Sequence, residues 1–279
     1  MDATALPPAL PQLPDFDLVD RLPSLAAGDG RLVRAGRGRP GMPTLLFVPG
    51  AFHGAWCYAG YLEYFAGLDI ACAALDLPGH GWLPQTPAFP RYGVRDFGDC
   101  VARAMDLIDG PVVVAGHSMG ALPALHAASQ RKTAGVVLMA PSPPGNIPGA
   151  RPIAPVPVGM SRQPPDLDGV RQRFTGAMSR QDITTVAARL CPESPEAMND
   201  RYLLRLHIPR QAIDAPGLCL EAGNDDPDRH PPGQDKAVAD FYGFEYRLLP
   251  ALQHCMMYAR GWQESAAAIR EWYEHRFPR

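Results

Sequence analysis

The sequence predicts an α/β fold, a mostly parallel and doubly wound sheet with a helical cap inserted between two of its strands. Three observations predict it. Short apolar runs alternate with segments of helical spacing along most of the chain. One such run turns sharply into a helix within residues 111–130, PVVVAGHSMGALPALHAASQ. The alternation stops between about residues 141 and 213, where proline-rich linkers separate helical segments.

The individual elements follow from these periodicities. An edge hairpin is expected within residues 28–41, which are rich in glycine and arginine. Short apolar runs predict buried strands at residues 44–48, 70–75, 112–114, 135–140, 217–222 and 244–249. Helical spacing predicts helices at residues 58–66, 96–108, 235–242 and 259–275, with another directly after Ser118.

The same pattern divides the chain into an arm, a core and a cap. Residues 1–27 are expected to form a proline-rich N-terminal arm. Residues 28–141 and 213–279 form the predicted α/β core, and residues 142–212 form the cap. Three cap helices are expected, near 169–178, 183–190 and 195–207, the last with Ser194 as N-cap and Pro195 at its first position.

Composition limits the possible partners and cofactors. A net charge of −3 without a basic stripe argues against nucleic-acid binding. No apolar run approaches the roughly 20 residues that a membrane span needs, and the N-terminus lacks the pattern of a secretory signal. The six cysteines are scattered without a C-x-x-C pair, which predicts a reducing, cytoplasmic location without a metal cluster. No sequence motif indicates a metal or organic cofactor, and the oligomeric state is left open.

A nucleophile is indicated at Ser118, within Gly116-His117-Ser118-Met119-Gly120. A buried strand before this G-x-S-x-G motif and a helix after it are the context of a nucleophile elbow. The flanking glycines fit a turn too crowded for side chains. The positive N-terminal end of the helix would face negative charge that develops at the serine.

These segments together resemble the α/β-hydrolase family from about Gly28 onward. The family order of nucleophile, acid and histidine implies Ser118, Asp226 and His254, each after a sheet strand. Gly223-Asn224-Asp225-Asp226 resembles the family's G-x-x-D turn, which favours Asp226. Asp225 is its rival, with an Asx-turn role as the alternative interpretation, and Asp228 is weaker.

The resemblance also implies an oxyanion hole made by the backbone N–H groups of Ala51 and Met119. The HGxW-type run 49–56, PGAFHGAW, is similar to the loop of plant methylesterases, hydroxynitrile lyases and many bacterial esterases. Cys255 stands where the lyases place a lysine, which argues against lyase chemistry. Asp76 and His80 are interpreted as residues that fix the DLPGHG turn.

The predicted function is that of a serine hydrolase, which cleaves a carboxylic ester, thioester or lactone through an acyl-enzyme. The alternatives are non-hydrolytic use of the same site (acyl transfer, carbon–carbon bond cleavage or cyclisation) and a ligand-binding protein on a hydrolase scaffold. The expected partner is a medium-sized, largely apolar small molecule, with a carrier-bound acyl group as one form of it.

Candidate substrate contacts come from the oxyanion loop, the cap and the histidine loop. They are Phe52, His53, Trp56, Met160, Met178 and Cys255. His53 could line the entrance or hydrogen-bond its own loop, and the cap methionines, Met198 included, could simply form the core of the cap. The cap arginines, among them Arg173 and Arg201, could meet an anion, although a solvated helix face is the favoured interpretation.

Overall fold

The computed structural model describes residues 13–278, so the first twelve residues of the predicted arm lie outside the described part. Its centre is an eight-stranded sheet in the order β1-β2-β4-β3-β5-β6-β7-β8. The pairs from β4 through β8 are parallel, whereas β1–β2 and β2–β4 are antiparallel. The strands are β1 (Ser24–Ala27), β2 (Gly30–Ala35), β3 (Thr44–Val48), β4 (Cys72–Asp76), β5 (Val112–His117), β6 (Gly135–Met139), β7 (Gly217–Ala222) and β8 (Glu245–Leu249).

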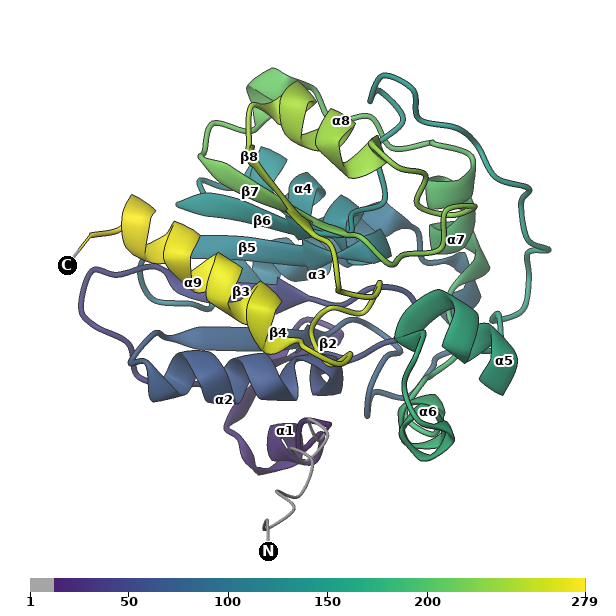
Figure 1. Ribbon diagram of the computed structural model, residues 1–279, viewed down its shortest axis with the longest axis horizontal. Coiled ribbons are helices and arrows are strands. Elements are labelled where there is room, and N and C mark those ends of the chain that lie inside the picture. The colour runs from purple at the N-terminus through teal and green to yellow at the C-terminus, as the bar shows by residue number, and fades with distance from the viewer. Residues whose placement is uncertain (1–12, 279) are drawn as a thin grey trace, which may run out of the picture.

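Helices cover both faces of this sheet, with α2 and α9 in front and α3 and α4 behind in Figure 1. Every residue of the central strand β5 is buried, as expected for a parallel strand packed on both faces. The predicted fold class is confirmed. The helices of the core are α1 (Leu18–Arg21), α2 (Ala59–Gly67), α3 (Val94–Asp106), α4 (Ala121–Gln130), α8 (Gln234–Tyr242) and α9 (Gln263–Arg276), with short 3₁₀ turns at Ala55–Tyr58, Phe89–Arg91, Ser118–Gly120 and Arg210–Ala212.

The N-terminal boundary differs from the prediction. Ser24–Ala27, assigned to the arm, pair with Gly30–Ala35 as an antiparallel hairpin at the sheet edge. Gly28, with φ 62°, makes the turn between the two strands. The sheet therefore begins at residue 24, because backbone pairing extends to residues whose side chains carry no strong strand signal.

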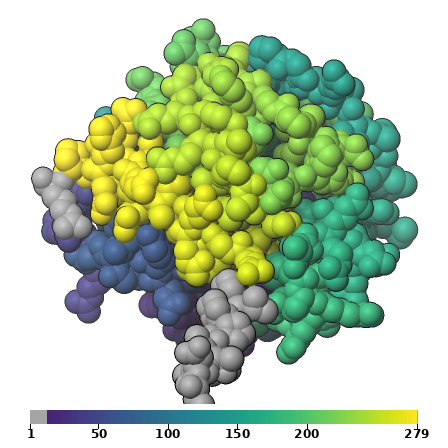
Figure 2. Space-filling model, in the orientation of Figure 1, coloured from purple at the N-terminus to yellow at the C-terminus, as the bar shows by residue number. Residues whose placement is uncertain are grey.

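The cap lies between β6 and β7 and occupies the right-hand side of Figure 1. It contains α5 (Leu167–Val170), one π-helical segment (Arg171–Thr175), α6 (Arg180–Ala187) and α7 (Pro195–Tyr202). Ser194 caps α7 as predicted, but the helix ends at Tyr202 instead of residue 207. Leu204 has φ 55°, which a continuing right-handed helix does not allow. In Figure 2 the cap, in teal and green, packs directly against the yellow-green C-terminal segments.

Among residues 13–278, no helix has both the length and the apolar character needed to cross a lipid bilayer.

Candidate active site

Ser118 sits at the sharp turn between β5 and α4. Its φ of 52° lies in the left-handed region that a residue with a side chain rarely adopts. The turn leaves no room for neighbouring side chains. A Cβ at Gly116 would lie 2.6 Å from the Gly120 carbonyl oxygen, and one at Gly120 would lie 2.3 Å from the Pro49 carbonyl oxygen. The two glycines therefore allow the strained turn that presents the serine hydroxyl.

His254 follows β8 and hydrogen-bonds Ser118 and an acid through its two ring nitrogens. Its Nε2 lies 2.9 Å from Ser118 Oγ, and its Nδ1 lies 2.7 Å from Asp225 Oδ2. An ionised carboxylate only accepts hydrogen bonds, so Nδ1 carries the proton and Nε2 faces the serine as an acceptor. Only 7% of the His254 and Asp225 side chains is exposed, so little water competes for these bonds.

The acid is Asp225, and the prediction that Asp226 would meet His254 is wrong. Asp226 instead accepts a hydrogen bond from the Asp228 backbone N–H at 3.1 Å and lies 4.0 Å from Arg229. Both aspartates stabilise the turn, because Asp225 Oδ1 also accepts a hydrogen bond from the Asp226 backbone N–H at 2.6 Å. Consecutive side chains in a turn point in different directions, so a shift of one residue decides which carboxylate reaches the imidazole.

Ser118 lines a pocket, called the hollow below, and Ala51 and Met119 line the same pocket. The Met119 N–H lies directly after Ser118, just before α4 begins. In the part of the chain that the structure describes, the Ala51 N–H has no hydrogen-bond partner, whereas the next N–H, that of Phe52, donates to Glu193 Oε2 at 3.1 Å. This arrangement leaves the two expected N–H donors open to a ligand oxygen.

The cap holds the loop after β3 at Phe52, whose φ is 69°. Besides the Glu193 contact, the Cys191 N–H donates to the Phe52 carbonyl at 3.0 Å. Such a conformation is unfavourable for a bulky residue and persists only when its surroundings enforce it. These cap contacts therefore position the loop that carries Ala51.

Glu193 also binds His80, and both residues are almost completely buried. The two ring nitrogens of His80 lie 3.0 Å from acceptors, the Pro78 carbonyl and Glu193 Oε2, so the imidazole is held as a cation. Burial acts to lower the pKa of His80, but the Glu193 carboxylate, together with the Pro78 carbonyl and Asp76, outweighs it, and the pKa is raised above its ordinary value. His80 therefore joins the DLPGHG turn to the cap.

His53 hydrogen-bonds its own loop and does not line the hollow. Its Nδ1–H donates to the Ala51 carbonyl at 2.8 Å, and its Nε2 accepts from the Tyr258 hydroxyl at 2.9 Å. Burial lowers the pKa of His53 to about 4, so the ring is neutral. His117 is also a positioning residue, because its Nε2–H donates to the His254 carbonyl at 2.9 Å. Burial lowers the pKa of His117 as well.

Of the other predicted substrate contacts, only Phe52 lines the hollow. Met160 points to solvent with 81% of its surface exposed. Trp56 packs on the His53 ring, and Met178 and Cys255 are buried away from the hollow. The apolar character of a residue predicted burial but not which cavity it would face.

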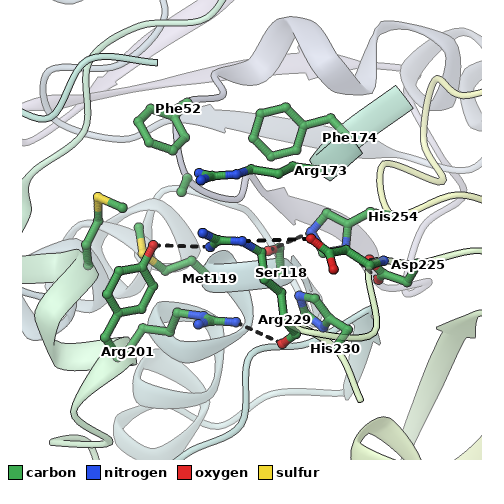
Figure 3. A pocket seen from close by; sticks show the side chains of 14 residues that line it. Phe52, Ser118, Met119, Arg173, Phe174, Arg201, Asp225, Arg229, His230 and His254 are labelled. Carbon is green, nitrogen blue, oxygen red and sulfur yellow. Dashed lines mark hydrogen bonds and ion pairs between the residues drawn. The ribbon is translucent and has the colours of Figure 1, made fainter. Parts of the chain in front are cut away.

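The residues that line the rest of the hollow were not among the predicted substrate contacts, although contact of cap arginines such as Arg173 and Arg201 with an anion was the less favoured interpretation. Figure 3 shows several of them around Ser118, from the cap and from the loop after β7. The hollow is narrow, because the volume inside it that is open to the centre of a water molecule is only about 50 Å³. The additional lining residues are Arg173, Phe174, Met198, Arg201, Tyr202, Arg229 and His230. The cap arginines were visible in the sequence, but the face to which each points was not.

Asp225, His230 and His254 each bring a potential metal-ligand atom within 4.8 Å of the others. Asp225 and the Nδ1 of His254 already use each other as hydrogen-bond partners. Burial lowers the pKa of His230, and the nearby Arg201 and Arg229 guanidinium groups lower it further. These positive charges beside the cluster disfavour a cation there, so the geometry fits proton transfer better than metal binding.

Comparisons with known proteins agree with this geometry. Residues 45–268 match the model of the alpha/beta hydrolase family. Lipase LipV of Mycobacterium tuberculosis is 33% identical over 144 residues, which are 50% of this chain and 54% of that protein. The match thus spans about half the length of that curated relative.

Solved structures share the fold at low sequence identity. One is an N-acyl homoserine lactonase in complex with N-hexanoyl homoserine, with a TM-score of 0.72 and 14% identity over 92% of this chain and 98% of that one. Another is the methylesterase MES16 from Arabidopsis, with a TM-score of 0.68 and 16% identity over 84% of this chain and 100% of that one.

Proposed function

This chain belongs to the alpha/beta hydrolase family, and from that premise we propose that it is a serine hydrolase that cleaves a carboxylic ester, thioester or lactone. The single observation that carries the proposal is the continuous hydrogen-bonded line from Ser118 through His254 to Asp225. A hydroxyl, an imidazole and a buried carboxylate in this order are the groups that acyl transfer to serine requires.

The proposed reaction has two halves. Ser118 Oγ attacks the carbonyl carbon while His254 Nε2 takes the hydroxyl proton, and Asp225 stabilises the imidazolium through Nδ1–H. The tetrahedral intermediate collapses to an acyl-enzyme, and His254 returns the proton to the leaving group. Water then attacks the acyl carbon, giving its proton to His254, and the acid leaves as Ser118 regains its hydrogen.

The backbone N–H groups of Ala51 and Met119 are the proposed oxyanion donors. Each such donor is typically worth about 3 kcal/mol of transition-state stabilisation in a preorganised site. The contacts of Phe52 with Glu193 and Cys191 support this role, because they hold the loop before any substrate binds.

The apolar part of the substrate is proposed to contact Phe52, Phe174 and Met198, which line the hollow beside Ser118. The narrow hollow suits a small acyl group, and a carrier-bound acyl group is an acceptable form of substrate only if the cap opens further. The six cysteines are all free thiols, which supports the proposed cytoplasmic location.

The proposal predicts that a fluorophosphonate probe labels Ser118 in the folded protein. The activated hydroxyl attacks phosphorus, so intact-mass and peptide mass spectrometry should place one adduct on that residue. Ser118→Ala should abolish both labelling and hydrolysis of a p-nitrophenyl ester. Ser129→Ala, in the helix α4 that follows Ser118, should change neither. Labelling elsewhere, or full ester hydrolysis by Ser118→Ala, would overturn the proposal.

A further inference from the structure

Three arginine side chains from separate segments converge on the hollow that contains Ser118. Arg173 belongs to the π-helical segment of the cap, Arg201 belongs to α7, and Arg229 belongs to the loop after β7. Figure 3 shows the Arg173 and Arg229 guanidinium groups beside Ser118 and that of Arg201 next to them, directed at the Arg229 backbone carbonyl. Three segments distant in sequence thus bring positive charge to one small volume.

This positive charge is poorly compensated by the protein. Arg201 is only 9% exposed, and its hydrogen bonds go to neutral acceptors, Ser142 Oγ at 2.9 Å and the Arg229 carbonyl at 3.3 Å. Among residues 13–278, no carboxylate lies within 4.0 Å of the Arg173 or Arg201 guanidinium. Burial lowers the pKa of Arg201 to about 10, and the more distant Asp225 carboxylate offsets only part of this effect.

The nearby acids do not neutralise the three arginines. Asp225 is hydrogen-bonded to His254, and Asp226 lies 4.0 Å from Arg229. Asp225 acts on Arg201, and Asp226 on Arg173, only through longer-range attraction without an ion pair. A buried charge that serves only the fold is normally paired, because leaving it unpaired is strongly destabilising. An uncompensated guanidinium beside a nucleophile is instead the arrangement of a site that receives an anion.

The arginines are also held in place before any ligand arrives. The Arg201 guanidinium lies over the Tyr202 ring at 5.2 Å, and Arg229 donates to the Tyr202 hydroxyl at 3.3 Å. Side chains fixed in this way lose little conformational freedom when an anion binds. Tyr202 therefore organises two of the three arginines.

We propose that Arg173, Arg201 and Arg229 bind an anionic group, a carboxylate or a phosphate, of the same molecule whose acyl carbon Ser118 attacks. This inference rests on the proposed function, since it names the substrate class of that site. The narrow hollow places the anion within a few bonds of the scissile carbonyl. The substrate class is thus an acidic ester or thioester with a short apolar part, and the expectation of a largely apolar substrate is revised.

The test compares a charged ester with its neutral counterpart. Monoethyl glutarate, diethyl glutarate and the phosphonate-bearing ethyl phosphonoacetate would serve as substrates, the last to distinguish a phosphate-type anion from a carboxylate. We expect kcat/KM of the wild type to be higher for one of the two anionic esters than for the neutral diethyl glutarate. Arg173→Gln and Arg201→Gln should each lower that value about 10- to 100-fold, the loss expected for one charge-assisted hydrogen bond, and change it less than about 3-fold for the diethyl ester.

Arg171→Gln is the matched control, because Arg171 lies two residues before Arg173 in the same π-helical segment but is exposed. It should leave both substrates unaffected. Arg173→Lys should recover part of the preference for the anionic ester by restoring the charge. Equal use of charged and neutral esters by the wild type, or the same loss in Arg171→Gln, would overturn the inference.

A second measurement separates this inference from the proposed function and does not depend on turnover. Glutarate or inorganic phosphate at millimolar concentration should slow fluorophosphonate labelling of Ser118 in the wild type, but not in Arg173→Gln, whose fold is checked by circular dichroism. Labelling that proceeds at the same rate with and without either anion contradicts the anion site alone. Absence of labelling contradicts the serine hydrolase itself.

Discussion

At the scale of single residues, the identity of the acid depends on one step along the turn after β7. Both Asp225 and Asp226 accept a hydrogen bond from the backbone of the turn, but of the two only Asp225 reaches His254, with Oδ2 at 2.7 Å from Nδ1. Both carboxylate side chains are only 7% exposed, so burial does not distinguish them. Only the direction of each side chain distinguishes the two aspartates, so mutation of each should have a different effect.

We expect Asp225→Asn to lower kcat by about 10³- to 10⁴-fold, because the amide no longer holds the imidazole in the tautomer that accepts the serine proton. Asp226→Asn should lower kcat by less than about 10-fold, and the exposed Asp228→Asn should have no effect. Steady-state kinetics with one ester would measure all three. A larger loss in Asp226→Asn than in Asp225→Asn would reverse the assignment.

At the scale of elements, the cap and the oxyanion loop are joined through one buried carboxylate. Glu193 accepts hydrogen bonds from His80 Nε2, from the Phe52 N–H and from the Ser194 N–H. It thereby links the segment before α7 to the turn after β4 and to the loop after β3. A cap fixed in this way contributes to the site without touching the reacting atoms.

Glu193→Gln is expected to lower the melting temperature by about 5 to 10 °C, because it leaves His80 without its buried partner. The folded-state pKa of His80 is raised, so the pair stabilises the fold fully below about pH 6.5 and loses this effect as the pH rises through the raised value. The difference in melting temperature between wild type and Glu193→Gln, measured by circular dichroism, should therefore become smaller from pH 6 to pH 9. A difference that becomes larger over this range would contradict the proposed ion pair between His80 and Glu193. Glu63→Gln, at an exposed position, serves as the control.

At the scale of the whole molecule, three neutral histidines surround the site, of which His53 and His117 are buried and His230 is partly buried. His53, His117 and His230 all have pKa values lowered by burial. Nδ1 of His117 and Nδ1 of His230 have no hydrogen-bond partner among the described residues. Each ring must take up a proton when the chain unfolds in acid, so together they make the fold sensitive to low pH.

A histidine of this kind contributes its full stabilisation of the fold above its unfolded-state pKa of about 6.5. This contribution is lost as the pH falls toward the lowered pKa of the folded state. For His53 that value is about 4. Each histidine can contribute up to about 1.4 kcal/mol per pH unit in this window. We expect His53→Gln to lose less stability than wild type between pH 6.5 and pH 5, measured by urea denaturation. The exposed His275→Gln should follow the wild type, and identical slopes for all three proteins would refute the assignment.

The sequence by itself determined the fold class, the family and the segments that meet around Ser118. These properties depend on the period of apolar residues and on turns that only glycine permits, which are local features of the chain. The hydrogen bond between Ser118 and His254 follows from the loops that a parallel sheet brings together at one edge.

Only the tertiary structure decided which aspartate faces His254, that His53 turns inward, and that Arg173 and Arg201 face the hollow and not the solvent. The physical reason is that each of these outcomes depends on side-chain direction. In a turn or a π-helical segment that direction is set by packing against segments far away in sequence, here the cap against the ends of the strands.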